Sequence, residues 1–119
     1  MKIAIYDEIQ VRRETAVRLV SGYYKEKGDS IEILQFKEAT ELTEVFQKNN
    51  FSAVFIGINS MRDIDAAWVI RERDKKCPLV LMGRSGDYSL EGYRLEVLDY
   101  LLEPLDKEKT YNALGRLKP

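Results

Sequence analysis

The chain alternates short apolar runs with longer segments in which apolar residues recur every three or four positions. Two of the runs, 53–56 (AVFI) and 79–82 (LVLM), are apolar at every position. A strand with one face in water alternates apolar and polar residues, so an unbroken apolar run predicts a strand that is covered on both faces. The segments of helical period between the runs supply the covers. This alternation predicts the α/β class, with a parallel sheet between two layers of helices.

Five strand and helix pairs can be assigned along the chain. The strands are expected at 3–6, 31–34, 53–56, 79–82 and 97–101, and the helices at 9–27, 38–47, 63–73, 88–93 and 106–117. In the first helix Ile9, Arg13, Ala16, Leu19, Val20 and Tyr23 recur at helical spacing. The expected fold is a flavodoxin-like (βα)5 doubly wound parallel sheet with strand order 2-1-3-4-5. The 119 residues fit one domain, spanning 1–119, and leave no room for a second.

Composition excludes several classes of function. Lys and Arg number 19 against 20 Asp and Glu, a balance that argues against nucleic-acid binding by this domain. The chain has no histidine, which excludes His-based triads and His-metal sites. Cys77 is the only cysteine, so an internal disulfide is impossible and a reducing compartment is expected. Met1 leads directly into a strand pattern and no apolar run approaches the ~18 residues of a membrane span. We therefore expect a cytoplasmic domain without a membrane partner.

In doubly wound sheets the functional groups lie at the carboxyl ends of the strands. Asp7 and Glu8 follow the first strand there, and together they could bind a hard cation such as Mg²⁺. Alternatively, Asp7 caps the first helix and Glu8 favours its positive end. Gly57, Gly83 and Glu103 end the third, fourth and fifth strands. The loops after the two glycines fit neither a Walker nor a dinucleotide-binding motif.

The sequence from Leu90 to Pro104 (LEGY followed by LDYLLEP) resembles the end of receiver domains in LytTR-type bacterial response regulators. The likeness spans Ile3 to about Leu117. Carried over by position, the resemblance implies that Asp7 and Glu8 are the acidic pair of a receiver and Tyr100 its aromatic switch. It further implies that Gly57 stands at the phosphoacceptor position, Gly83 at the hydroxyl position and Glu103 at the lysine position.

These three substitutions remove the phosphorylation chemistry of a receiver. An acyl phosphate needs a carboxylate nucleophile, and Gly57 has no side chain. Gly83 lacks a hydroxyl, and Glu103 would repel a phosphoryl group. We therefore expect a degenerate (pseudo-)receiver that is not an enzyme, requires no cofactor and binds Mg²⁺ weakly at a vestigial site of Asp7 and Glu8. Two alternatives stay open. One is a conventional phosphorylated receiver with a displaced acceptor, for which the nearby candidates are Asn59, Asp63 and Asp65. The other is a small-ligand sensor.

The resemblance also implies a mode of action. Receivers dimerise or dock on proteins through the face of their fourth helix, fifth strand and fifth helix, which here would carry Tyr93, Tyr100 and Tyr111. Such domains usually precede a DNA-binding output, so residues 1–119 are expected to be the N-terminal part of a longer regulator. The expected partners are a second copy or another protein. An internal cation should replace the lost lysine and meet Asp7 or Glu8, with Arg84 as first candidate and Arg62 as second.

Overall fold

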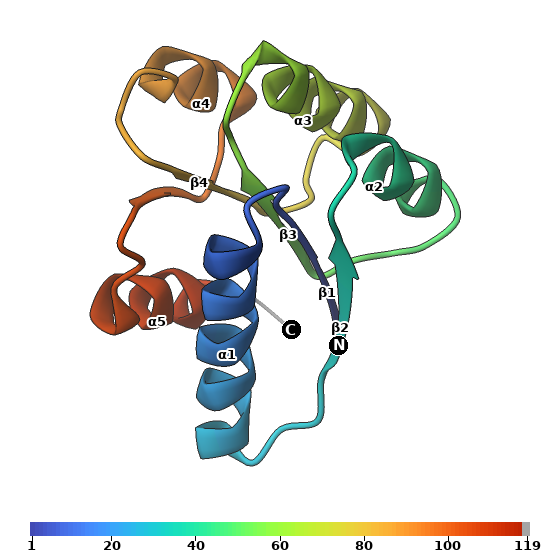
Figure 1. Cartoon of the computed structure of the whole chain (residues 1–119). Coiled ribbons are helices and arrows are strands. Elements are labelled where there is room, and N and C mark those ends of the chain that lie inside the picture. Colours follow the sequence, from blue (N-terminus) through green and yellow to red (C-terminus); the bar gives the residue numbers. More distant parts are fainter. Residues whose placement is uncertain (118–119) are drawn as a thin grey trace.

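The computed structural model describes residues 1–117. Its elements follow one another in strict alternation (Figure 1): β1 (Lys2–Tyr6), α1 (Gln10–Lys27), β2 (Glu32–Phe36), α2 (Ala39–Phe46), β3 (Ala53–Gly57), α3 (Met61–Arg73), β4 (Leu79–Gly83), α4 (Ser89–Leu95), β5 (Asp99–Leu102) and α5 (Lys107–Gly115). None of the helices in this part of the chain combines the length and the apolar character needed to cross a membrane.

The five strands form one parallel sheet in the order β2-β1-β3-β4-β5, which confirms the predicted topology. Every residue of β3 and β4 is buried, as their unbroken apolar sequences predict. The edge strands β2 and β5 are partly exposed. The buried strands β1, β3 and β4 therefore form the rigid frame for any site at the carboxyl edge of the sheet.

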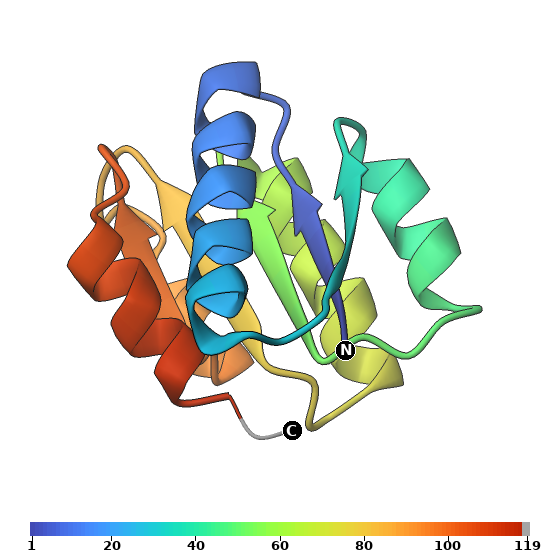
Figure 2. The same ribbon diagram turned by 90° about the horizontal axis from the view of Figure 1, so that it is seen from below.

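Helices cover both faces of the sheet (Figure 2). On one face α1 and α5 pack over Ile3, Ile5, Phe55 and Met82. On the other face α2, α3 and α4 pack over side chains that alternate with these along the strands, which are Ala4, Tyr6, Val54, Ile56, Leu79 and Leu81. The alternation follows from the period of two in a strand, since successive side chains point to opposite faces.

Some boundaries and faces differ from the expected ones. The fifth strand begins at Asp99 rather than Val97, because the Val97 N–H bonds the Gly92 carbonyl and closes the end of α4. The largest change is in α1, where Arg12 and Tyr24 are buried instead of Arg13 and Tyr23. Both pairs of residues fit a helical period, and the way α1 packs on the sheet decides which pair is buried.

Arg71 holds α3, β4 and α4 together. Its buried guanidinium donates to the Leu95 carbonyl at 2.8 Å, the Cys77 carbonyl at 2.8 Å and the Asp74 carbonyl at 3.1 Å. These carbonyls lie at the end of α4 and in the turn that leads into β4. One planar cation thereby fixes α4 against the rest of the domain, since a guanidinium offers five donors in a rigid fork.

We expect Arg71→Met to lower the free energy of unfolding by about 2–4 kcal/mol, because buried carbonyls lose their donors. Arg73→Met is the matched control: Arg73 is exposed and makes one bond, to the Gln47 carbonyl. The control should change stability by about 0.5 kcal/mol or less. Urea denaturation measures both. Equal losses in the two variants would contradict the assigned role of Arg71.

Candidate functional site

The carboxyl edge of the sheet brings together the residues that the sequence singled out. Tyr6 pairs with Ile56, Gly57 with Met82, and Gly83 with Leu102. The residues that follow these pairs therefore meet at one edge. Asp7 lies beside Gly57, and Glu103 donates its backbone N–H to the Gly83 carbonyl at 2.8 Å.

Asp7 is fully buried, and donors occupy its carboxylate. Oδ2 accepts from Nε of Arg12. Oδ1 accepts from Nη2 of Arg12 at 3.1 Å and from the Ile9 backbone N–H at 2.9 Å. The amide of Asn59 approaches Oδ1 at 3.4 Å. The first helix begins at Gln10 with Ile9 as its N-cap, so Asp7 accepts from the backbone N–H of the cap residue and is not itself the cap.

Arg12 is the cation of the site. It is 3% exposed, and besides its bonds to Asp7 it donates through Nη2 to Oδ1 of Asn59 at 2.9 Å. Its Nη1 lies 3.5 Å from Oε2 of Glu103. One guanidinium thus joins the ends of β1, β3 and β5.

The structure corrects the expected choice of internal cation. Arg84 lies on the exposed loop after β4, and its Nε meets Oε1 of Glu103 at 3.4 Å rather than Asp7 or Glu8. Arg62 lies 3.9 Å from Glu8, with both side chains largely in solvent. Arg12 takes the inner position because α1 begins three residues after Asp7, so the first turn of the helix carries its side chain directly over the buried carboxylate.

Gly57 has no room for a side chain. A Cβ built there would overlap the carboxyl group of Asp7. The carboxylate of Asp7 therefore fills the volume that a longer residue at position 57 would use. Gly57 is required by this close approach, since only glycine lets a neighbouring group contact the backbone so closely.

Gly83 lies under the ring of Tyr100. A Cβ at Gly83 would come within 3.2 Å of the Tyr100 hydroxyl oxygen, and that hydroxyl donates to the Ser85 carbonyl at 3.0 Å. Burial raises the pKa of the Tyr100 hydroxyl, so it stays a neutral donor near neutral pH. The ring of Tyr100 and the loop after β4 are thus held in one arrangement.

The residues present do not fit a magnesium site. Asp7 directs its oxygens at Arg12, and Glu8 lies on the surface beside Arg62. Among residues 1–117 no three Asp, Glu, His or Cys side chains are grouped so that they could hold a metal ion. A guanidinium occupies the interior, where a second cation would meet repulsion.

The three residues considered as displaced acceptors are engaged or remote. Asp63 is buried, accepting from the Tyr6 hydroxyl at 2.6 Å and from the Asn59 backbone N–H at 2.8 Å. Burial, followed by the bond to Asp63, raises the pKa of Tyr6. Asp65 is exposed on α3, and the side-chain amide of Asn59 bonds Arg12.

The three tyrosines assigned to one interface do not share a face. Tyr93 is 81% exposed on α4, and Tyr100 packs near Gly92 and Gly83. Tyr111 instead turns toward α1, where its ring meets Tyr23 edge to face at 5.1 Å between centroids. The expectation for Tyr111 was wrong, because α5 packs on α1 and not on α4.

Comparison with solved structures decides the fold. The structure matches the response regulatory domain of protein mrkE from Klebsiella pneumoniae with a TM-score of 0.83 and 22% identity, over 98% of this chain and 94% of that one. It matches chemotaxis protein CheY4 of Vibrio cholerae with a TM-score of 0.75 and 20% identity, over 98% of both chains. The fold is that of CheY-like receiver domains. No protein-family model matches the sequence.

One curated protein aligns along the receiver fold. The "Sensory transduction protein LytT" of Bacillus anthracis is 23% identical over 121 residues, which cover 99% of this chain. The alignment takes in 47% of that protein, so the present chain spans about half the length of its relative.

Sequence reasoning missed Arg12, although a signal was present. Arg12, Ala16, Val20 and Tyr24 are spaced four residues apart, and all are buried. A charged residue at the start of such a stripe, close to an acid at the end of a strand, indicates a buried ion pair. The expected pattern runs through Arg13 instead, which in the structure is half-buried and donates to the Asp7 carbonyl at 2.7 Å.

We expect Arg12→Met to lower the free energy of unfolding by about 3–5 kcal/mol, because it leaves Asp7 as an uncompensated buried charge. The double variant Asp7→Asn with Arg12→Met should regain most of this loss. Arg62→Met serves as control, since exposed ion pairs contribute about 1 kcal/mol or less. Urea denaturation measures the free energy of unfolding of the two single variants and of the double variant. Additive losses from Asp7→Asn and Arg12→Met would contradict the pairing.

Proposed function

We propose that the chain is a receiver-like regulatory domain of a two-component response regulator that acts without phosphorylation of an aspartate. One observation carries the proposal: the carboxylate of Asp7 fills the space over Gly57, and Arg12 holds it there. Gly57, Gly83 and Glu103 are then a degenerate phosphorylation site, and Asp7 and Glu8 a vestigial metal site. The domain is regulatory and not an enzyme.

The comparisons support this class of function. The aligned solved structures include a response regulatory domain and a chemotaxis protein, and the curated relative is a sensory transduction protein. The likeness to LytT agrees with the resemblance of the sequence from Leu90 to Pro104 to LytTR-type receivers. We infer that the receiver-like domain spans 1–119 within a longer cytoplasmic regulator, whose attached or partner output binds DNA. The domain itself does not contact nucleic acid.

A receiver signals by switching between two arrangements, and a ligand can shift their populations only by binding one better. In this chain, side chains of the domain itself favour one arrangement in place of a ligand. Arg12 supplies the cation, Asp7 the anion over Gly57, and Tyr100 fills the space above Gly83. We infer that the domain is held constitutively in one arrangement and that its partner recognises that arrangement.

The docking surface that we propose is an apolar patch on α4 and β5, formed by Leu90, Tyr93 and Leu102. These side chains are 55%, 81% and 49% exposed. Leu90 and Tyr93 are three residues apart on α4 and so share a face. Tyr100, next to Leu102 on the same side of β5, approaches Gly92 and so links the strand to the helix. The occupant that we propose is a second copy of the domain or a partner protein.

Incubation with acetyl phosphate and Mg²⁺ should leave the intact mass of the protein unchanged. A stoichiometric adduct that hydroxylamine removes from the unaltered chain would overturn the proposal and favour a displaced acceptor.

Tyr93→Asp should weaken self-association about tenfold or more, because it places a charge at the centre of an apolar contact. Val69→Asp is the control, since Val69 is also an exposed apolar residue but lies on α3. Sedimentation equilibrium measures both variants. If the unaltered domain stays monomeric at high concentration and the full-length regulator is monomeric as well, the patch has no role in dimerisation.

A further inference from the structure

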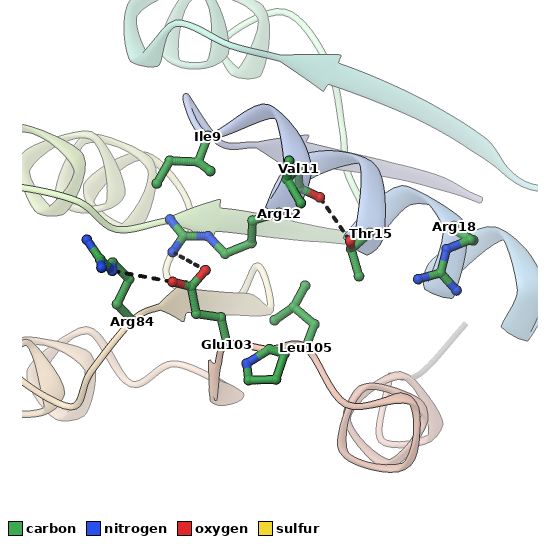
Figure 3. Close-up of a pocket in the computed structure, with 9 residues that line it drawn as sticks. Ile9, Val11, Arg12, Thr15, Arg18, Arg84, Glu103 and Leu105 are labelled. Atoms are coloured by element: carbon green, nitrogen blue, oxygen red, sulfur yellow. Dashed lines mark hydrogen bonds and ion pairs between the residues drawn. The ribbon is translucent and has the colours of Figure 1, made fainter.

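A hollow opens beside the site on the side of the sheet that α1 and α5 cover (Figure 3). Its volume is about 650 Å³, and it lies between the first turns of α1 and the segment that follows β5. Val11, Pro104 and Leu105 form apolar walls. Val11 is 77% exposed, which is unusual for an apolar side chain at the start of a helix.

The charged groups of this hollow are mostly cationic. Arg12, Arg18 and Arg84 line it together with a single acid, Glu103. Figure 3 shows the carboxylate of Glu103 between the guanidinium groups of Arg12 and Arg84, at 3.5 and 3.4 Å. Both distances exceed the ~2.7–2.9 Å of a charge-assisted hydrogen bond.

One donor of the hollow has no acceptor. Nη1 of Arg12 is buried and makes no hydrogen bond within the part of the chain that the structure describes. The acid that it faces is Glu103, at 3.5 Å, whose side chain is 33% exposed. A buried charged donor without a hydrogen bond is costly, so an acceptor that reached it at proper distance would bind favourably.

We propose that this hollow binds a small organic carboxylate with a short apolar tail. Its carboxylate takes the position of Glu103 and accepts from Nη1 of Arg12 and from Arg84, while Glu103 swings outward. The tail lies on Val11, Pro104 and Leu105. Arg18 adds attraction at the mouth of the hollow. Glu103 is thus an internal occupant that competes with the ligand, and binding would change the end of β5. The proposed binding does not rest on whether the domain is phosphorylated.

The chemistry favours a carboxylate over a phosphate. The gap between the two guanidinium groups already accommodates a planar carboxylate, that of Glu103. The walls beside this gap are apolar, and Arg18 lies farther along α1 (Figure 3), so a third anionic oxygen has no donor at this point. Inorganic phosphate therefore serves as a separate probe, and it should bind more weakly than the carboxylate.

The test is a titration of the folded domain with hexanoate, 1-hexanol and inorganic phosphate, followed by ¹H–¹⁵N correlation spectra. Hexanoate should give saturable shifts of the amides of Thr15, Arg84 and Leu105, and the neutral alcohol should bind at least about fivefold more weakly, because it lacks the charge that the arginines recognise. If phosphate binds more tightly than hexanoate at these amides, the assignment of a carboxylate is overturned.

Variants at the mouth of the hollow test the competition without removing Arg12 from the interior. Glu103→Gln should tighten hexanoate binding about tenfold, because it removes the competing charge. Arg18→Gln should weaken it. Glu44→Gln is the matched control, an exposed acid on α2 on the opposite face of the sheet, and should have no effect. The proposal is wrong if hexanoate gives no saturable shifts, or if Glu103→Gln and Glu44→Gln bind it equally.

Discussion

The buried ion pair of Asp7 and Arg12 organises the carboxyl edge of this domain. Each group alone would be costly in the interior, and together they satisfy most of each other's hydrogen bonds. The pair fixes the first turn of α1 on the end of β1, reaches β3 through Asn59, and approaches β5 through Glu103. The geometry of Gly57 follows from it, since the Asp7 carboxylate needs the space that a side chain would take.

The substitutions at the strand ends form one consistent arrangement. Gly57 admits the carboxylate of Asp7, and Gly83 admits the ring of Tyr100. Glu103 contributes a negative charge that meets the outer side of Arg12 and the exposed Arg84. A metal ion needs acids whose oxygens are free to bind it, and here the oxygens of Asp7 are taken by Arg12. Here the cation belongs to the protein itself, so the interior is closed to a second one.

The same guanidinium links the inside of the domain to the hollow on its surface. Nη2 and Nε of Arg12 are committed to Asp7 and Asn59, whereas Nη1 faces Glu103 at a distance too long for a hydrogen bond. Nε and Nη2 thus meet groups at the ends of β1 and β3, whereas Nη1 faces the end of β5. A change at Glu103 can therefore reach Asp7 through one rigid, planar group.

The sequence alone determined the fold class, the strand order and the positions of the site at the strand ends. Unbroken apolar runs can be buried only between two helical layers, and parallel topology then brings Asp7, Gly57, Gly83 and Glu103 to one edge. The tertiary structure alone decided which arginine enters that edge and which way Tyr111 turns. Arg12 and Arg13 both fit the helical period of α1, and one helical step of about 100° separates an interior residue from a half-buried one. The spacing of Arg12, Ala16, Val20 and Tyr24 is compatible with an inward Arg12, but the choice itself depends on how α1 packs against β1 and α5, which is a property of contacts between distant segments.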